Sequence, residues 1–179
     1  AAPSRPAAKS AAPTAKPPAL AAVPSPWKEA DIGKVGVRGA AQGRTLKAVI
    51  PGGSSSPILP AAIMMECTMD YDSIAKAGSM LGSGAVIVID DSRCMVESLK
   101  RLSYFYMHES CGQCTPCRSG TQKARMLMER GIWDAELLGE LGQVMRDASI
   151  CGLGQAASNP LMSVITYFPH LLTSREAAE

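Results

Sequence analysis

The sequence has few aromatic side chains, little charge imbalance and no long apolar run. Aromatic residues make up 4% of the 179 residues, and 18 Lys and Arg against 16 Asp and Glu give a formal net charge of +2. The charges are scattered, so they form no basic stripe or aromatic-interleaved patch of the kind that binds nucleic acids. Nucleic acid is therefore not an expected partner.

Long apolar segments are also missing. The longest apolar stretches, such as residues 84–89, fall far short of the roughly 20 residues that a membrane-spanning helix needs. Residues 1–26 are rich in Ala and Pro and lack the continuous apolar core of a secretory signal. We therefore expect neither membrane insertion nor export, and 46% apolar residues are enough for an ordinary soluble core.

The N-terminal segment, residues 1–29, has almost no large apolar side chain before Leu20 and contains many prolines. Such a composition favours extended, solvated backbone, so we expect a disordered or linker segment. A transit peptide is the alternative for this Ala-rich, acid-poor stretch, although its amphipathic Arg-Ser pattern is missing.

A small α/β unit is expected next. Residues 46–50 and 84–89 have the β-branched, apolar composition of strands, and the Gly- and Ser-rich segment 51–57 predicts a turn after the first strand. A short helix is expected over residues 72–80. The glycine-rich turn is not a phosphate-binding loop, because no Lys follows at the required position.

The pattern becomes helical after Ser92. Apolar residues at spacings of three and four predict four short helices and hence a bundle. The first follows Ser92 and ends at the cysteine triplet, and the others are expected over residues 116–130, 134–147 and 158–172. The side chains expected to face inward are Met95, Leu99, Leu102, Tyr106, Leu137, Leu138, Leu141 and Met145, with Met126 and Met128 also filling the core.

Three cysteines, Cys111, Cys114 and Cys117, are separated by two residues each. This spacing lets three thiolates on one loop meet three corners of an iron–sulfur cubane. Cys151 is the expected fourth ligand, because the 33 residues after Cys117 are the length of two helices and a turn and would return the chain to the loop. The pattern predicts one 4Fe–4S cluster.

Six cysteines also allow other chemistry. Four thiolates satisfy tetrahedral zinc, so a structural zinc-binding or assembly module without redox chemistry remains the alternative hypothesis. Disulfides are disfavoured, because near neighbours in a tight triplet seldom pair with one another. A reducing, cytoplasmic setting fits better.

Four further residues are considered beside the motif, two cysteines in the α/β unit and two residues that flank the triplet. Cys67 and Cys94 lack partners at ligand spacing, so both are expected to be buried thiols outside the site. His108 either tunes the cluster through a hydrogen bond or charge, or is structural. Arg118 either raises the cluster potential by its charge or pairs with an acidic neighbour.

The segment 108–118, His-Glu-Ser-Cys-Gly-Gln-Cys-Thr-Pro-Cys-Arg, resembles the C-terminal half of the NADH-binding flavoprotein subunit of respiratory complex I. Residues 69–73 and 81–88 carry the same resemblance, which covers about residues 44–172. The family includes the diaphorase subunits of NAD-dependent formate dehydrogenases and NAD-reducing hydrogenases.

The resemblance implies an α+β fold: a partial β-grasp (ubiquitin-like) domain over residues 30–92 and a helical cluster-binding domain, a four-helix bundle, over residues 93–179.

In the family, hydride from NADH reduces FMN, and single electrons leave through the cluster. The resemblance implies that Gly152 and Leu153 lie near FMN. It also implies two partners, a thioredoxin-like 2Fe–2S subunit and a larger iron–sulfur subunit. The implied location is the cytoplasm or the cytoplasmic face of a membrane complex.

The FMN- and NADH-binding domain of the family has no counterpart in this sequence. We therefore expect that the chain alone binds neither FMN nor NAD. The segment 150–155, Ile-Cys-Gly-Leu-Gly-Gln, is more similar to the soluble formate dehydrogenase and hydrogenase diaphorases than to respiratory complex I.

Overall fold

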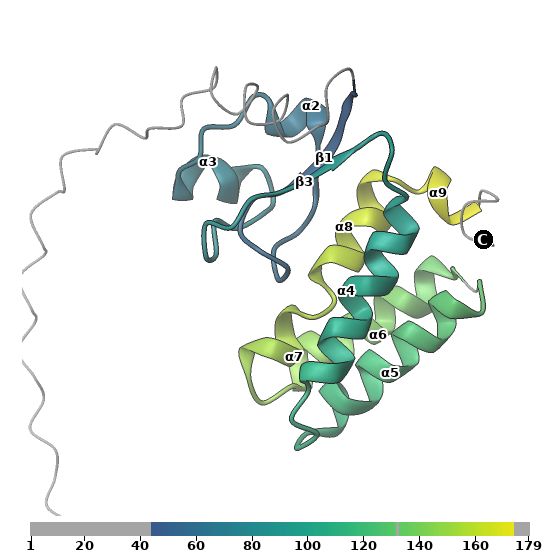
Figure 1. The fold of residues 1–179 in the computed structure, drawn as a ribbon. Coiled ribbons are helices and arrows are strands. Elements are labelled where there is room, and N and C mark those ends of the chain that lie inside the picture. The colour runs from purple at the N-terminus through teal and green to yellow at the C-terminus, as the bar shows by residue number, and fades with distance from the viewer. Residues whose placement is uncertain (1–43, 132, 174–179) are drawn as a thin grey trace, which may run out of the picture.

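The computed structural model describes residues 44–131 and 133–173, which form a small sheet beside a set of helices (Figure 1). The predictions for residues 1–29 and for the first part of the 30–92 domain lie outside the described residues. The mixed α and β composition is confirmed. Within the described part of the chain, no helix is long and apolar enough to cross a membrane.

The sheet has three strands in the order β2-β1-β3, and both neighbouring pairs are antiparallel. The strands are β1 (Leu46–Ile50), β2 (Leu59–Pro60) and β3 (Ile87–Asp90), and two short helices, α2 (Ala61–Met64) and α3 (Tyr71–Lys76), lie between β2 and β3 in the chain. The β-grasp assignment and the 92/93 domain boundary stay predictions.

Six helices follow the sheet in the described part of the chain: α4 (Met95–Glu109), α5 (Thr115–Glu129), α6 (Ala135–Ala148), α7 (Gly152–Ala156), α8 (Asn159–Tyr167) and α9 (His170–Thr173). α5 packs against α4 and α6, and α8 contacts the same two helices from the other side. The short α7 contacts α5 and α6. Figure 1 shows α7 and the α4–α5 loop at the end of the helices that is remote from the sheet.

The three longer helices match their predicted ranges closely, and the helix predicted over residues 158–172 begins as predicted, at Asn159, but does not continue unbroken to residue 172. It is broken at Phe168, because a residue before a proline disfavours helical backbone and Pro169 follows. The helix predicted over residues 72–80 ends at Lys76, and Gly78 then turns the chain with a φ of 87°. The last strand begins later than predicted, after Gly84, whose φ is 71°.

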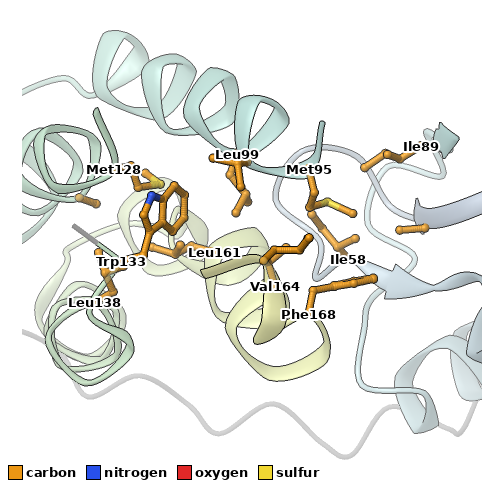
Figure 2. Close-up of a cluster of buried hydrophobic side chains, with 14 of the residues drawn as sticks. Ile58, Ile89, Met95, Leu99, Met128, Trp133, Leu138, Leu161, Val164 and Phe168 are labelled. Carbon is orange, nitrogen blue, oxygen red and sulfur yellow. The ribbon is translucent and has the colours of Figure 1, made fainter. Parts of the chain in front are cut away.

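One buried apolar cluster joins the sheet to the helices (Figure 2). Ile58 and Ile89 contribute from the strand region, and Met95, Leu99 and Val164 from α4 and α8. The sheet and the helices therefore share part of one core. The prediction that the Leu137 side chain faces inward is wrong. This side chain is 38% exposed, whereas that of its neighbour Leu138 is fully buried.

The turn over residues 51–57 fastens the sheet to the helices. Asn159 Nδ2 donates to the Ser55 carbonyl oxygen at 2.9 Å, and the Ile58 N–H donates to Ser163 Oγ at 2.8 Å. A side chain at Gly52 would lie within 3 Å of the Met80 backbone, so the close approach there requires glycine. The prediction of a turn is confirmed.

Candidate metal centre

The four cysteines predicted as ligands lie in two segments at the same end of the helices. Cys111 is in the loop between α4 and α5, Cys114 is the N-cap of α5, and Cys117 is in the first turn of α5. Cys151 is the N-cap of α7. Figure 1 shows the α4–α5 loop and α7 together at this end.

The Cys114 thiol connects the two segments. The backbone N–H of Ile150 is the largest of the causes that hold the pKa of Cys114 below its usual value, followed by the N–H of Cys117, with a smaller contribution from the Ser149 hydroxyl. Partial burial acts in the opposite direction. α7, whose N-cap is Cys151, packs against α5, so the fold brings the segment of the fourth cysteine to the triplet.

Cys117 is the buried member of the set, at 5% exposure. Its Sγ atom lies 3.3 Å from Ser110 Oγ at the end of α4. α7 packs closely over it, because a Cβ atom placed on Gly154 would be only 2.8 Å from the Cys117 Cβ. The absence of a side chain at Gly154 therefore allows α7 to approach the first turn of α5.

The chemistry of the donor set fits an anionic iron–sulfur group. All four cysteines are free thiols, and Cys111 and Cys151 are exposed. The 15-residue α5 begins at the triplet with no acidic residue in its first turn, so its unpaired N–H groups favour negative charge there. Within residues 44–131 and 133–173, no three His, Cys, Asp or Glu side chains are grouped closely enough to hold a single metal ion.

The cysteine loop is held by a turn and by one arginine. Gly112 has a φ of 76°, a left-handed conformation that L side chains rarely adopt. Arg118 Nη1 donates to the Gly112 carbonyl oxygen at 3.2 Å, and the Gly112 N–H donates to Ser110 Oγ at 3.3 Å. No ion pair joins Arg118 to an acidic residue in the described part of the chain. Arg118 therefore stabilises the cysteine loop through its hydrogen bond to the Gly112 carbonyl oxygen.

The remaining candidates are His108, Cys67 and Cys94. The exposed His108 pairs through Nδ1 with Glu109 Oε1 at 3.2 Å. Cys67 is buried, as predicted, and its Sγ donates to the Ile63 carbonyl oxygen at 3.2 Å. The prediction of burial is wrong for Cys94, which is exposed as the N-cap of α4, where the chain leaves the sheet.

Gly152 and Leu153 are the first two residues of α7. Gly152 is exposed, and an added Cβ would meet no atom within 4 Å. Leu153 is partly buried. The implied position of both residues near FMN stays a prediction.

Sequence reasoning missed three residues that shape the site: Ser110, Ser149 and Gly154. The two serines stand one and two positions before Cys111 and Cys151, a local pattern that could have drawn attention to them. No signal in the sequence distinguishes Gly154 from the other glycines, because its importance comes from the contact of α7 with Cys117.

Comparison with known proteins agrees with this arrangement. Residues 97–175 match the family described as the NADH-ubiquinone oxidoreductase-F iron–sulfur binding region. The F subunit of the NADH-quinone oxidoreductase of Rickettsia bellii (strain OSU 85-389) is 44% identical over 146 residues, which are 78% of this chain and 34% of the relative. An F subunit of the same enzyme in Rhizobium meliloti (strain 1021) is 45% identical over 129 residues, which are 69% and 30% of the two chains.

A solved structure also resembles the chain. The crystal structure of NAD+-reducing [NiFe]-hydrogenase in the H2-reduced state superposes with a TM-score of 0.62 at 34% identity, covering 72% of this chain and 23% of that one. The helices and cysteine loop thus define an iron–sulfur-binding region. Over the matched part, the chain is similar to the C-terminal part of the NADH-quinone oxidoreductase F subunits, which confirms the resemblance seen in the sequence. It spans about a third of the length of the relatives named above.

Proposed function

We propose that the chain binds one 4Fe–4S cluster through Cys111, Cys114, Cys117 and Cys151 and relays single electrons between FMN, held outside these residues, and downstream iron–sulfur centres. The observation that carries the proposal is the packing of α7, whose N-cap is Cys151, over the first turn of α5, where a Cβ atom on Gly154 would lie 2.8 Å from the Cys117 Cβ. It joins the triplet to the segment of the fourth cysteine. The match to an iron–sulfur binding region supports the same ligand set.

The residues of the chain have separable tasks at this site. Cys117, which is buried, anchors the cluster to α5, whereas Cys111 and Cys151 are exposed and leave the cluster open toward another domain or subunit. When bound, the cluster supplies one-electron redox chemistry. The α5 N-terminus and the Ile150 N–H stabilise its negative charge.

The parent enzyme in this proposal is an NAD-linked multisubunit oxidoreductase of the NADH dehydrogenase or diaphorase type. FMN and NAD bind outside this chain, with Gly152 and Leu153 facing the flavin. The partners are a thioredoxin-like 2Fe–2S subunit and a larger iron–sulfur subunit, at a cytoplasmic location. The 150–155 segment favours a soluble enzyme such as an NAD-dependent formate dehydrogenase or a hydrogenase.

The first test is the nature of the bound metal. The full chain, purified without oxygen, should be brown, contain about four irons and four sulfides, the composition of the cluster, and lose its colour with dithionite. The reduced protein should give the electron paramagnetic resonance (EPR) signal of a one-electron-reduced cluster. A colourless protein with stoichiometric zinc would instead establish the structural zinc hypothesis.

The second test compares two exposed cysteines that each precede a helix, Cys151 and Cys94. Cys151→Ser should lose the cluster or convert it to a form with fewer irons, whereas Cys94→Ser should keep the full iron content. In the intact assembly, Cys151→Ser should abolish NAD-linked electron transfer to distal acceptors and leave the reduction of ferricyanide by NADH. Normal onward transfer in Cys151→Ser contradicts the ligand assignment.

A further inference from the structure

A serine hydroxyl lies at the buried cysteine. Ser110 is the C-cap of α4, and its Oγ atom is 3.3 Å from Cys117 Sγ. The same oxygen accepts the N–H of Gly112 at 3.3 Å, so one of its two lone pairs is engaged and its proton is free to point toward sulfur. In a free thiol either atom can donate, but a cysteine sulfur bound to iron has no proton. In the cluster-bound protein the donor must therefore be Ser110.

A second hydroxyl lies at Cys114. Ser149 is the C-cap of α6 and only 6% exposed, and its Oγ makes no hydrogen bond of regular geometry with the described residues. Its hydroxyl is one of the groups that lower the pKa of the Cys114 thiol. It is also within 3 Å of the point where a Gly154 Cβ would be, as is the Cys117 Cβ. A buried hydroxyl without an acceptor is costly, and the nearest use for it is a sulfur atom of the site.

A buried threonine hydroxyl in α5 does not share this property. Thr121 is also buried, at 3% exposure, but its Oγ1 donates to the Cys117 carbonyl oxygen at 2.9 Å. Its proton is already used by the backbone. The two serines thus differ from a neighbouring buried hydroxyl in having a proton available for sulfur.

We propose that Ser110 and Ser149 are positioning residues that donate O–H···S hydrogen bonds to the Cys117 and Cys114 thiolates and raise the reduction potential of the cluster. This inference rests on the proposed function, because it takes these cysteines as ligands. Reduction adds negative charge to the cluster and its thiolates, so a hydrogen-bond donor stabilises the reduced form more than the oxidised form. Removing a donor lowers the potential.

The test uses the full chain loaded with its cluster, in which the midpoint potential is measured by an EPR-monitored redox titration. Ser110→Ala and Ser149→Ala should each disfavour one-electron reduction by about three- to tenfold, where tenfold corresponds to 59 mV. The double variant should show about the product of the two factors. Ser110→Thr keeps the hydroxyl at a partly exposed position and should return the potential close to that of the unaltered chain.

Ser163→Ala is the matched control. Ser163 is also 6% exposed and hydrogen-bonded, to the Ile58 N–H and the Pro160 carbonyl, but it lies on α8 and has no contact with a cysteine among its hydrogen bonds. Its loss should reduce thermal stability without moving the potential. A Ser149→Ala chain that does not load its cluster leaves Ser110→Ala to decide the question.

The outcomes separate this inference from the function on which it rests. Fully loaded alanine variants with the potential of the unaltered chain overturn the hydrogen bonds while leaving the electron relay in place. A control that shifts as much as the test variants also overturns them. An unaltered chain that binds zinc and no cluster overturns the proposed function itself.

Discussion

The two ends of the helices differ in what holds them together. At the sheet end, Met95 and Leu99 of α4 are buried with at most 1% exposure in a continuous apolar cluster. At the cysteine end, Cys111 and Cys151 are exposed, and Ile150, which precedes Cys151, is 78% exposed. The fold is thus closed by apolar burial at one end and left open at the other.

The two ends of the helices therefore have different roles. Apolar burial stabilises the packed end without any cofactor. The cysteine end instead directs N–H groups and hydroxyls toward sulfur, which is useful only for a charged group bound there. We therefore expect substitutions at the two ends to have separable effects, on global stability at one end and on cluster binding at the other.

The largest effect on stability is expected at the packed end, from Leu138→Ala. Leu138 is fully buried, so its truncation should cost about 2–5 kcal/mol of unfolding free energy through lost burial and a cavity. Leu137→Ala is the matched control, because its side chain is 38% exposed, and should cost about 0.5 kcal/mol or less. Urea unfolding of the cluster-free chains measures both. Similar losses for the two leucines would contradict the orientation of α6.

An intermediate effect is expected at the cysteine end, from Gly154→Ala. The added methyl group would overlap Ser149 and the Cys117 Cβ, so α7 must move away from α5 at a cost of about 1–3 kcal/mol. The iron content should fall as well, since Cys151 moves with α7. Gly152→Ala, in the same helix, meets no atom within 4 Å and should retain both stability and iron. Full iron loading of Gly154→Ala would show that the close approach is not needed.

The parts of the fold that the sequence predicts well are those whose signal is local. α4, α5 and α6 each contain several turns, enough for an apolar period to be recognised, and the cysteine triplet has its spacing within seven residues. The five-residue α7 and two-residue β2 are too short to show any period, and neither was predicted. Pro169 could have marked the break after α8, but the apolar pattern continues across it.

The errors at single residues have a different cause. Leu137 and Leu138 are equivalent in composition, and only the position of the neighbouring helices decides which of them is covered. The exposure of Cys94 likewise depends on how α4 leaves the sheet. Ser149 matters because α6 ends beside Cys114, a contact between residues 35 positions apart. These features depend on packing between elements, which local patterns do not contain.

A smaller effect on stability is expected at the N-cap of α6, which lies at the end of the helix remote from the cysteines. Asp134 is its N-cap, and its Oδ1 accepts the N–H groups of Glu136 and Leu137 at 3.0 and 3.1 Å. Asp134→Ala should therefore cost about 1 kcal/mol, whereas Asp134→Asn keeps an acceptor and should cost little. Neither variant should change the iron content, because α6 meets the cysteine site only at its other end. Loss of iron in Asp134→Ala would show that the two ends are coupled through the helix.

The smallest effect is expected on the pH dependence of thermal stability, from Asp90 at the sheet end. The Ser92 hydroxyl and N–H hold the pKa of Asp90 below its ordinary value, with a further contribution from Arg44, while partial burial opposes them. A carboxyl whose folded pKa is depressed stabilises the fold above its unfolded pKa of about 3.9, and this contribution is lost as the pH falls through the folded value. Asp90→Asn should remove that pH dependence of thermal stability, while Glu140→Gln, at an exposed site on α6, should not. If both variants keep the pH profile of the unaltered chain, acid sensitivity does not arise at the packed end and must be sought at the open one.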